Sequence, residues 1–257
     1  MRKEQKMRAD GRSLDVLRTV EAIPHFHHLA EGSILYRAGG TTLLCTISFE
    51  EKVPPFLEGS KSGWLTAEYQ MHPRAHLKRQ EREGRRIGIT GRTQEIQRLI
   101  GRSLRAALDL TKLGPYTITV DCDVLEADGG TRTASITAGF IALALALFKK
   151  RQEGLLPTPL LREQICAISV GHLDGLGAAL DLTYVEDKEA QVDLNVVSSA
   201  KGNLVEVQGA AEGIPIPRSD FDEMLSLAIR GNQSLAQIQN QILASANADL
   251  EALLIYS

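Results

Sequence analysis

An apolar stretch at residues 138–148 constrains the fold more than any other part of the sequence. It belongs to residues 131–150, which are predicted to form one helix, and it is apolar on nearly every side. Such a helix has no polar face to present to water, so other elements must surround it. Its longest uninterrupted apolar run, residues 140–148, is far shorter than the roughly 20 residues that cross a bilayer. We therefore expect a buried core helix and no membrane partner.

Residues 155–161 separate two halves of similar pattern, because they contain Pro157 and Pro159 and make the best linker in the sequence. On both sides of the linker, strands are predicted to precede a long helix. The predicted fold class is α+β, with two similar strand-then-helix units and mixed sheets packed by helices. A chain of 257 residues fits one large domain. We expect a single domain over residues 1–257, with halves at about 8–154 and 162–245 and tails at 1–7 and 246–257.

The hydrophobic pattern also predicts the individual elements. Apolar and polar residues alternate along residues 116–125, as in a half-buried strand, whereas apolar residues over 92–110 recur with helical spacing. Ser219 to Asp222 resembles a capping box that opens a long helix through residue 242. The other predicted strands lie at residues 33–38, 41–50, 64–69, 165–173, 178–184, 193–199 and 204–207.

The start of the chain and its cysteines predict a cytoplasmic protein. Residues 1–5 are polar and no hydrophobic signal region follows them. The three cysteines, Cys45, Cys122 and Cys166, lie in apolar runs without the spacing of a metal site. Three cysteines cannot all pair, which favours a reducing compartment.

Basic residues gather in one segment of an otherwise acidic chain. Residues 74–105 contain ten Lys or Arg and three acids, so this segment carries +7 and the rest of the chain −10, for a total of −3. This asymmetry favours a local polyanion site on an acidic body. A solvated helix face with internal salt bridges explains the same charges equally well.

The sequence from Asp128 to Thr133, which reads Asp-Gly-Gly-Thr-Arg-Thr, indicates an anion site. It lies between a predicted strand and a predicted helix, where free N–H groups and the positive end of the helix dipole attract anions. Gly130 allows a close backbone approach, Thr131 adds a hydroxyl, and Arg132 adds a planar set of donors. A simple turn with Thr131 as a helix cap is the alternative. Arg92, at the start of another helix, is a second candidate for the same anion, or a solvent-facing arginine.

Asp187 and Asp193 are candidates for a divalent cation site. Asp187 lies in the loop between two predicted strands and Asp193 at the start of the second strand, so the two could converge on one ion. Mg²⁺ is commonly held by one or two carboxylates together with water and substrate oxygens. An acidic surface turn is the alternative for this pair. Asp121 and Asp123 share one face of a predicted strand and form a competing pair.

Eight stretches between about residues 8 and 235 form a recognisable set. They are Asp10-Gly11-Arg12, residues 63–69, Met71-His72-Pro73-Arg74, residues 91–102, residues 121–135, Glu186-Asp187, residues 193–197 and residues 207–213. Together they closely resemble the ribonuclease PH family of bacterial phosphorolytic exoribonucleases. Residues 77–90 follow the family less closely, and residues 237–257 have no match in it.

The resemblance implies a fold, a site and an assembly. The fold is the ribosomal-S5-like α+β fold, and the assembly is a hexameric ring built as a trimer of dimers. The implied cofactor is Mg²⁺ or Mn²⁺ on Asp187 and Asp193, which act in catalysis. Inorganic phosphate is the co-substrate and is implied to bind at Arg92, Gly130, Thr131 and Arg132.

The activity implied is phosphate-dependent 3′→5′ removal of RNA nucleotides as nucleoside diphosphates, with reversible nucleotide addition. Transfer-RNA precursors are the expected substrates, and ribosomal-RNA processing belongs to the same expectation. A non-catalytic RNA-binding ring subunit of an exosome-like complex is the alternative. The basic residues expected to contact RNA are Arg74, Lys78, Arg79, Arg82, Arg85 and Arg86.

Overall fold

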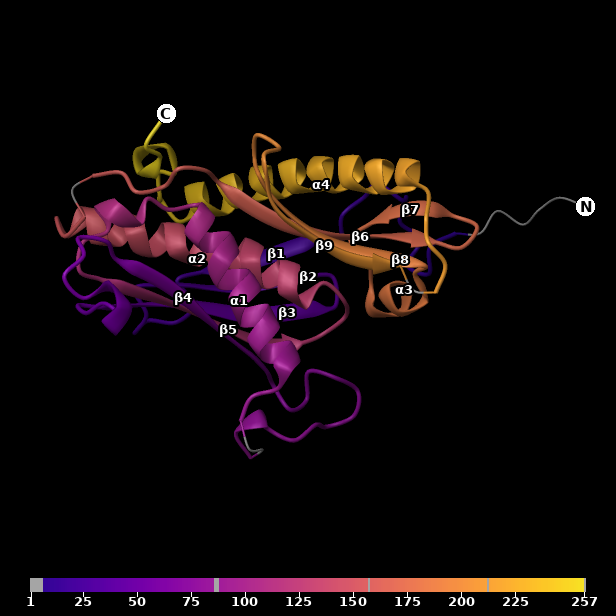
Figure 1. Ribbon diagram of the computed structural model, residues 1–257, viewed down its shortest axis with the longest axis horizontal. Coiled ribbons are helices and arrows are strands. Elements are labelled where there is room, and N and C mark those ends of the chain that lie inside the picture. The colour runs from indigo at the N-terminus through magenta and orange to yellow at the C-terminus, as the bar shows by residue number, and fades with distance from the viewer. Residues whose placement is uncertain (1–6, 86–87, 157, 212, 257) are drawn as a thin grey trace, which may run out of the picture.

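The computed structural model describes residues 7–85, 88–156, 158–211 and 213–256. Two sheets and their helices form a layered α+β structure, in which the elements of the two halves lie side by side (Figure 1). The elements in chain order are β1 (Val20–Pro24), β2 (Gly32–Ala38), β3 (Thr41–Glu50), β4 (Trp64–Met71), α1 (Gly91–Ala106), β5 (Thr117–Glu126), α2 (Thr131–Gln152), β6 (Ile165–Leu173), β7 (Gly177–Leu180), α3 (Tyr184–Glu189), β8 (Val192–Ser199), β9 (Leu204–Ala211) and α4 (Arg218–Ser245).

The first sheet has five strands in the order β1-β2-β3-β5-β4. All neighbours are antiparallel except β4 and β5, which run parallel, so the sheet is mixed as expected. The alternating side chains of β5 explain its position: Ile118, Val120 and Val124 are fully buried on one face, while Asp121 and Asp123 face the other way. The predicted strands at residues 33–38 and 41–50 form a hairpin, with its turn at Gly39-Gly40.

Helix α2 fills the space between the two sheets. Its side chains from Ile136 to Leu147 are all buried, as the apolar pattern predicts. The helix packs on β2 and β3 on one side and on β6 on the other. It is long and apolar enough to cross a membrane by composition, but 83% of its most apolar window is buried inside the protein, as in a core helix.

The second sheet has four antiparallel strands in the order β7-β6-β8-β9. Strand β6 is buried on both faces, because Ile165 and Ala167 pack with α2 while Cys166 and Ile168 pack with α4. This explains why β6 reads as a continuous apolar run rather than an alternating one. Helix α4 covers the outer face of this sheet (Figure 1).

The C-terminal residues pack back onto the linker. Leu161 donates its N–H to Leu253 O at 2.9 Å and accepts from the N–H of Ile255 at 2.7 Å. On its other side, Arg162 donates its N–H to Ala107 O at 2.7 Å. Leu253 is buried, so the end of the chain is part of the hydrophobic core.

Two expectations for local structure are wrong, and one strand was not expected. The strand predicted at residues 178–184 ends at Leu180, and Tyr184 begins α3 instead. The capping box at Ser219 does not form, because the N-cap of α4 is Pro217 and the Ser219 hydroxyl donates to Asp220. A capping box exists at the start of α3, between Thr183 and Glu186. Strand β1 was not anticipated, since its five residues carry little apolar pattern.

Gly32 on β2 lies where a side chain has no room. A Cβ atom there would collide with the Ala142 carbonyl oxygen and lie 2.7 Å from the Ala146 nitrogen, both in the backbone of α2. We therefore expect Gly32→Ala to lower the free energy of unfolding by about 1–3 kcal/mol through overpacking. Gly84→Ala is the matched control, because nothing lies within 4 Å of its added Cβ. Denaturant unfolding measures both, and equal stability of the two variants would contradict the close packing of β2 on α2.

Candidate active site

A cavity of about 1380 Å³ opens between the two halves. Its walls are the N-terminal ends of α1 and α2, helix α3, the start of β8 and the loop after β4. The candidate residues for phosphate and for metal from both halves line this one cavity. They are Arg92, Gly130, Thr131, Arg132, Asp187 and Asp193.

The Gly-Gly turn leaves the start of α2 open for an anion. Gly129 and Gly130 have φ values of +77° and +63°, a left-handed conformation that glycine adopts without strain. Gly130 is the N-cap residue and has no side chain to cap the helix. The N–H groups of the first helical turn have no carbonyl partner within the helix, so they are free to bind an oxyanion.

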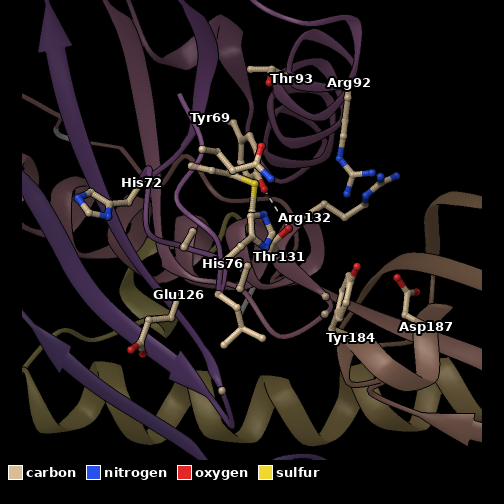
Figure 2. A pocket seen from close by; sticks show the side chains of 18 of the residues that line it. Tyr69, His72, His76, Arg92, Thr93, Glu126, Thr131, Arg132, Tyr184 and Asp187 are labelled. Atoms are coloured by element: carbon tan, nitrogen blue, oxygen red, sulfur yellow. Dashed lines mark hydrogen bonds between the residues drawn. The ribbon is translucent and has the colours of Figure 1, made fainter. Parts of the chain in front are cut away.

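Tyr69 is a site residue that sequence reasoning missed. Its hydroxyl lies 2.9 Å from the Thr131 hydroxyl, in a hydrogen bond that either group can donate (Figure 2). Burial raises the pKa of Tyr69, while the bond to Thr131 and the charges of Arg92 and Arg132 oppose the rise. Tyr69 therefore stays neutral and fixes the Thr131 side chain at the first turn of α2.

Arg92 and Arg132 provide positive charge where α1 and α2 begin at the cavity. Figure 2 shows their guanidinium groups next to each other, although one begins α1 and the other begins α2. Arg132 lies 3.6 Å from the Glu95 carboxylate, a long contact that leaves most of its donors available. Arg92 has no acidic partner within 4.0 Å among the described residues. Two adjacent arginines repel each other, so an anion between them would stabilise this arrangement.

Asp187 and Asp193 line the same cavity from the second half of the chain, on α3 and β8. The pKa of Asp187 is raised, first by partial burial and then by the charge of Asp193, while Arg132 and Arg92 act against the rise. These effects require the two carboxylates to be near each other and near the arginines. Asp187 lies on a short helix, not on the loop that the sequence indicated.

The turn at Gly129 and Gly130, called the phosphate turn below as the candidate phosphate site, is in direct backbone contact with the start of α3. A Cβ atom on Gly129 would lie 2.5 Å from Leu182 O and 2.8 Å from Tyr184 N, so only glycine allows this approach. Asp128 accepts a hydrogen bond from the Tyr184 N–H at 3.1 Å. The two halves of the chain are thus held together at the cavity itself.

Two buried arginine side chains hold the residues on either side of this contact. The Arg18 guanidinium donates to Asp128 O at 2.6 Å and to an Asp181 carboxylate oxygen at 2.6 Å. The Arg8 guanidinium donates to both carboxylate oxygens of Glu186, at 2.8 and 2.7 Å. Because both pairs are buried, these N-terminal arginines fix the phosphate turn and α3 strongly.

Models of one family match the chain on both sides of the linker. Domain 1 of the 3′ exoribonuclease family matches residues 16–149, and domain 2 of that family matches residues 163–231. The chain belongs to the 3′ exoribonuclease family. The resemblance found in the sequence and the predicted fold class are therefore both confirmed.

Relatives in this family match nearly the whole chain. A protein named Ribonuclease PH from Syntrophomonas wolfei is 49% identical over 236 residues, which cover 92% of this chain and 98% of that protein. A protein of the same name from Bacillus velezensis is 47% identical over 245 residues, covering 95% of this chain and 100% of that protein.

Solved structures show the same fold at lower identity. The structure of rice (Oryza sativa) Rrp46 has a TM-score of 0.74 and 18% identity, covering 92% of this chain and 100% of that one. A chain of an Archaeoglobus fulgidus exosome with RNA bound to the active site has a TM-score of 0.73 and 24% identity, covering 90% of this chain and 92% of that one.

The competing acidic pair, Asp121 and Asp123, lies outside the cavity. Asp121 and Asp123 point from β5 toward the face of the first sheet that α2 does not cover, and neither lines the cavity. Burial raises the pKa of both, and Asp123 and Glu68 raise that of Asp121 further.

The basic segment after β4 divides into two groups. Arg74 and Lys78 line the cavity, and Arg74 also donates to Leu77 O at 3.0 Å. Arg79 and Arg82 are exposed outside it. Arg86 and the side chain of Arg85 lie outside the described residues, so their contact with RNA stays a prediction.

We expect Arg132→Ala to weaken binding of inorganic phosphate by about tenfold or more, because a hydrogen bond to a charged group contributes roughly 1.5–3 kcal/mol. Arg92→Ala should behave alike. Arg98→Ala is the matched control, since Arg98 lies exposed on α1 and away from the cavity. Calorimetric titration with phosphate measures all three, and an Arg132→Ala protein with wild-type affinity would remove this residue from the site.

Proposed function

We propose that this chain is a phosphate-dependent 3′→5′ exoribonuclease that shortens RNA by one nucleotide at a time and releases nucleoside diphosphates. The observation that carries the proposal is the meeting of an anion site and an acidic pair across one cavity. The identity of 47–49% to proteins named Ribonuclease PH supports the same activity. The likeness to exosome chains would also fit a non-catalytic ring subunit, but such a subunit has no need of both groups of residues.

The reaction joins phosphate to the terminal nucleotide. An oxygen of inorganic phosphate attacks the phosphorus atom of the last phosphodiester, and the bond from that phosphorus to the 3′ oxygen of the preceding nucleotide breaks. The terminal nucleotide leaves as a diphosphate, and the preceding nucleotide becomes the new 3′ end. Because the nucleophile comes from solution, the protein has to hold two anions beside each other and neutralise them. The reverse reaction adds a nucleotide.

The residues of the cavity divide this work. Arg92, Arg132 and the free N–H groups at the start of α2 would hold the attacking phosphate. The Thr131 hydroxyl, fixed by Tyr69, would orient one of its oxygens. These donors are in place before the substrate arrives, so little reorganisation accompanies the reaction.

Asp187 and Asp193 would hold a Mg²⁺ or Mn²⁺ ion. Two carboxylates whose charges repel each other suit a hard divalent cation, which takes its other ligands from water and phosphate oxygens. Among the described residues no cluster of three or more His, Cys, Asp or Glu side chains offers a fuller set of ligands. When bound, the ion supplies positive charge to the scissile phosphate and the departing oxygen.

The finer features of the function belong to the same proposal. We expect transfer-RNA precursors as substrates, a cytoplasmic enzyme, and a hexameric ring built from dimers. The likeness to a chain of the Archaeoglobus fulgidus exosome supports the ring through the shared fold alone. The basic segment would grip the RNA backbone, because phosphate contacts supply affinity without reading sequence.

The decisive experiment is incubation with a 3′-tailed RNA in the presence and absence of phosphate. We expect degradation only with phosphate, release of nucleoside diphosphates, and nucleotide addition when diphosphates are in excess. Chromatography of the released nucleotides measures the outcome. Release of monophosphates without added phosphate would show that the chain is a hydrolase.

We expect Asp187→Asn and Asp193→Asn to raise the Mg²⁺ concentration for half-maximal activity by more than about tenfold, since each variant keeps the shape but loses a charged ligand. Asp121→Asn and Asp123→Asn are the matched controls on the other face of the first sheet. Metal titration of the activity tests the four proteins. If only the Asp121 and Asp123 variants raised the Mg²⁺ concentration for half-maximal activity, the metal site would be on β5 instead.

We expect the triple variant Lys78→Ala, Arg79→Ala and Arg82→Ala to bind RNA more weakly and with a shallower salt dependence. Each lost phosphate contact should reduce the log–log slope by about 0.7 for a single strand. A charge-matched control replaces the exposed Lys201, Arg218 and Arg230 by alanine. Filter binding from low to high salt measures the slopes. An unchanged slope together with a raised phosphate requirement would show that the segment serves the attacking phosphate instead.

A further inference from the structure

Tyr184 is an aromatic side chain without a packing partner in the cavity. It lines the cavity and remains 54% exposed. Among the described aromatic rings none stacks on it. An exposed tyrosine gains little from its apolar ring unless a ligand covers it. Its position at the wall between the phosphate turn and the acidic pair points to a ligand that binds in the cavity.

The backbone of Tyr184 is fixed to the phosphate turn. Its N–H donates to the Asp128 carboxylate at 3.1 Å. Gly129 approaches the same N–H so closely that an added Cβ would lie 2.8 Å away. The capping box of Thr183 and Glu186 holds the rest of α3 in place. The backbone that carries the ring is therefore held at a fixed position relative to the candidate phosphate site.

The direction of the side chain agrees with the shape of the product. Figure 2 shows Tyr184 and Asp187 pointing from α3 into the cavity, toward Arg132. In a nucleoside diphosphate the terminal phosphate is the former attacking ion, and the next phosphate is the scissile one beside the acidic pair. The base follows after one ribose. A base one ribose away from the scissile phosphate can reach the wall that carries Tyr184.

We propose that the ring of Tyr184 is the stacking platform for the 3′-terminal base of RNA, and for the base of a nucleoside diphosphate in the reverse reaction. The inference rests on the proposed function, which supplies the order of the two phosphates. Stacking uses the face of the base and not its edges, so all four bases are accepted. Such a platform suits an enzyme that has to proceed through any sequence.

The test is a cycle that combines a change in the protein with a change in the RNA. One RNA ends in an ordinary nucleotide, and a second ends in the same nucleotide with its base replaced by hydrogen. With the wild type, loss of the base should lower kcat/KM about tenfold, in line with the loss of one base–aromatic stack. In Tyr184→Ala the ordinary RNA should suffer the same loss, and removal of the base should cost nothing more.

Substitutions at and beside the ring separate stacking from other roles. Tyr184→Phe should retain wild-type kcat/KM because it keeps the ring, whereas Tyr184→Leu should resemble Tyr184→Ala. Val185→Ala is the matched control, since Val185 is 53% exposed on the same helix but does not line the cavity. The KM for inorganic phosphate should be unchanged in all four variants. The proposal would be overturned if Tyr184→Ala and removal of the base lowered kcat/KM independently of each other. Full activity of Tyr184→Leu would also overturn it.

Binding without catalysis distinguishes this inference from the proposed function. Calorimetry compares adenosine diphosphate with ribose 5-diphosphate, which lacks the base. Wild-type protein should bind adenosine diphosphate about tenfold more tightly, and Tyr184→Ala should bind the two equally. If this difference appears while the wild type releases no diphosphates from RNA, the stacking platform stands and the phosphorolytic function fails. Equal binding by the wild type would refute the platform.

Discussion

The burial of α2 between the two sheets is the packing interaction on which the rest of the structure depends. Small side chains in the middle of the helix let β2 approach it so closely that Gly32 has no room for a Cβ atom. On the other side the helix packs on β6. Because α2 begins at Gly130, the core that holds the helix also holds the open N–H groups of its first turn. Hydrophobic packing thereby gives the anion site its rigidity.

The cavity belongs to neither half of the chain alone. The arginines come from α1 and α2 of the first half, and the acidic pair comes from α3 and β8 of the second. Opposite charges across a cavity attract each other, but their spacing is set by backbone contact at Gly129 and by the Asp128 carboxylate. A fixed spacing matters for a reaction between two anions, because small errors in position weaken the stabilisation of the transition state.

The sequence predicted the elements with a strong local pattern and missed features that depend on distant partners. The alternation along β5 and the apolar run of α2 were enough to place both. The Asp-Gly-Gly-Thr-Arg-Thr motif predicted the turn before α2, because glycine spacing and a helix start are local features, whereas phosphate binding at this turn stays a prediction. The short strand β7 ends four residues before α3 begins, and no periodicity can mark a boundary between elements this short.

The missed site residues make contacts between distant parts of the chain, which local sequence patterns do not predict. Alternation on β4 places Tyr69 on the buried face, but its partner Thr131 is 62 positions away. The ion pair of Arg8 with Glu186 joins residues 178 positions apart. Composition gives the number of such charges but not their pairing. A buried tyrosine in a strand beside a predicted anion site was the one available signal, since its hydroxyl needs a partner when buried.

The pairing of Leu161 with Leu253 and Ile255 has a consequence for synthesis of the chain. The partners of this linker residue are translated more than ninety positions after it. While the ribosome is still adding residues of α4, the connection between the halves lacks one of its two flanking segments. Domains otherwise fold as they emerge. The native closure of this connection is therefore completed only after residues 253–255 have left the exit tunnel.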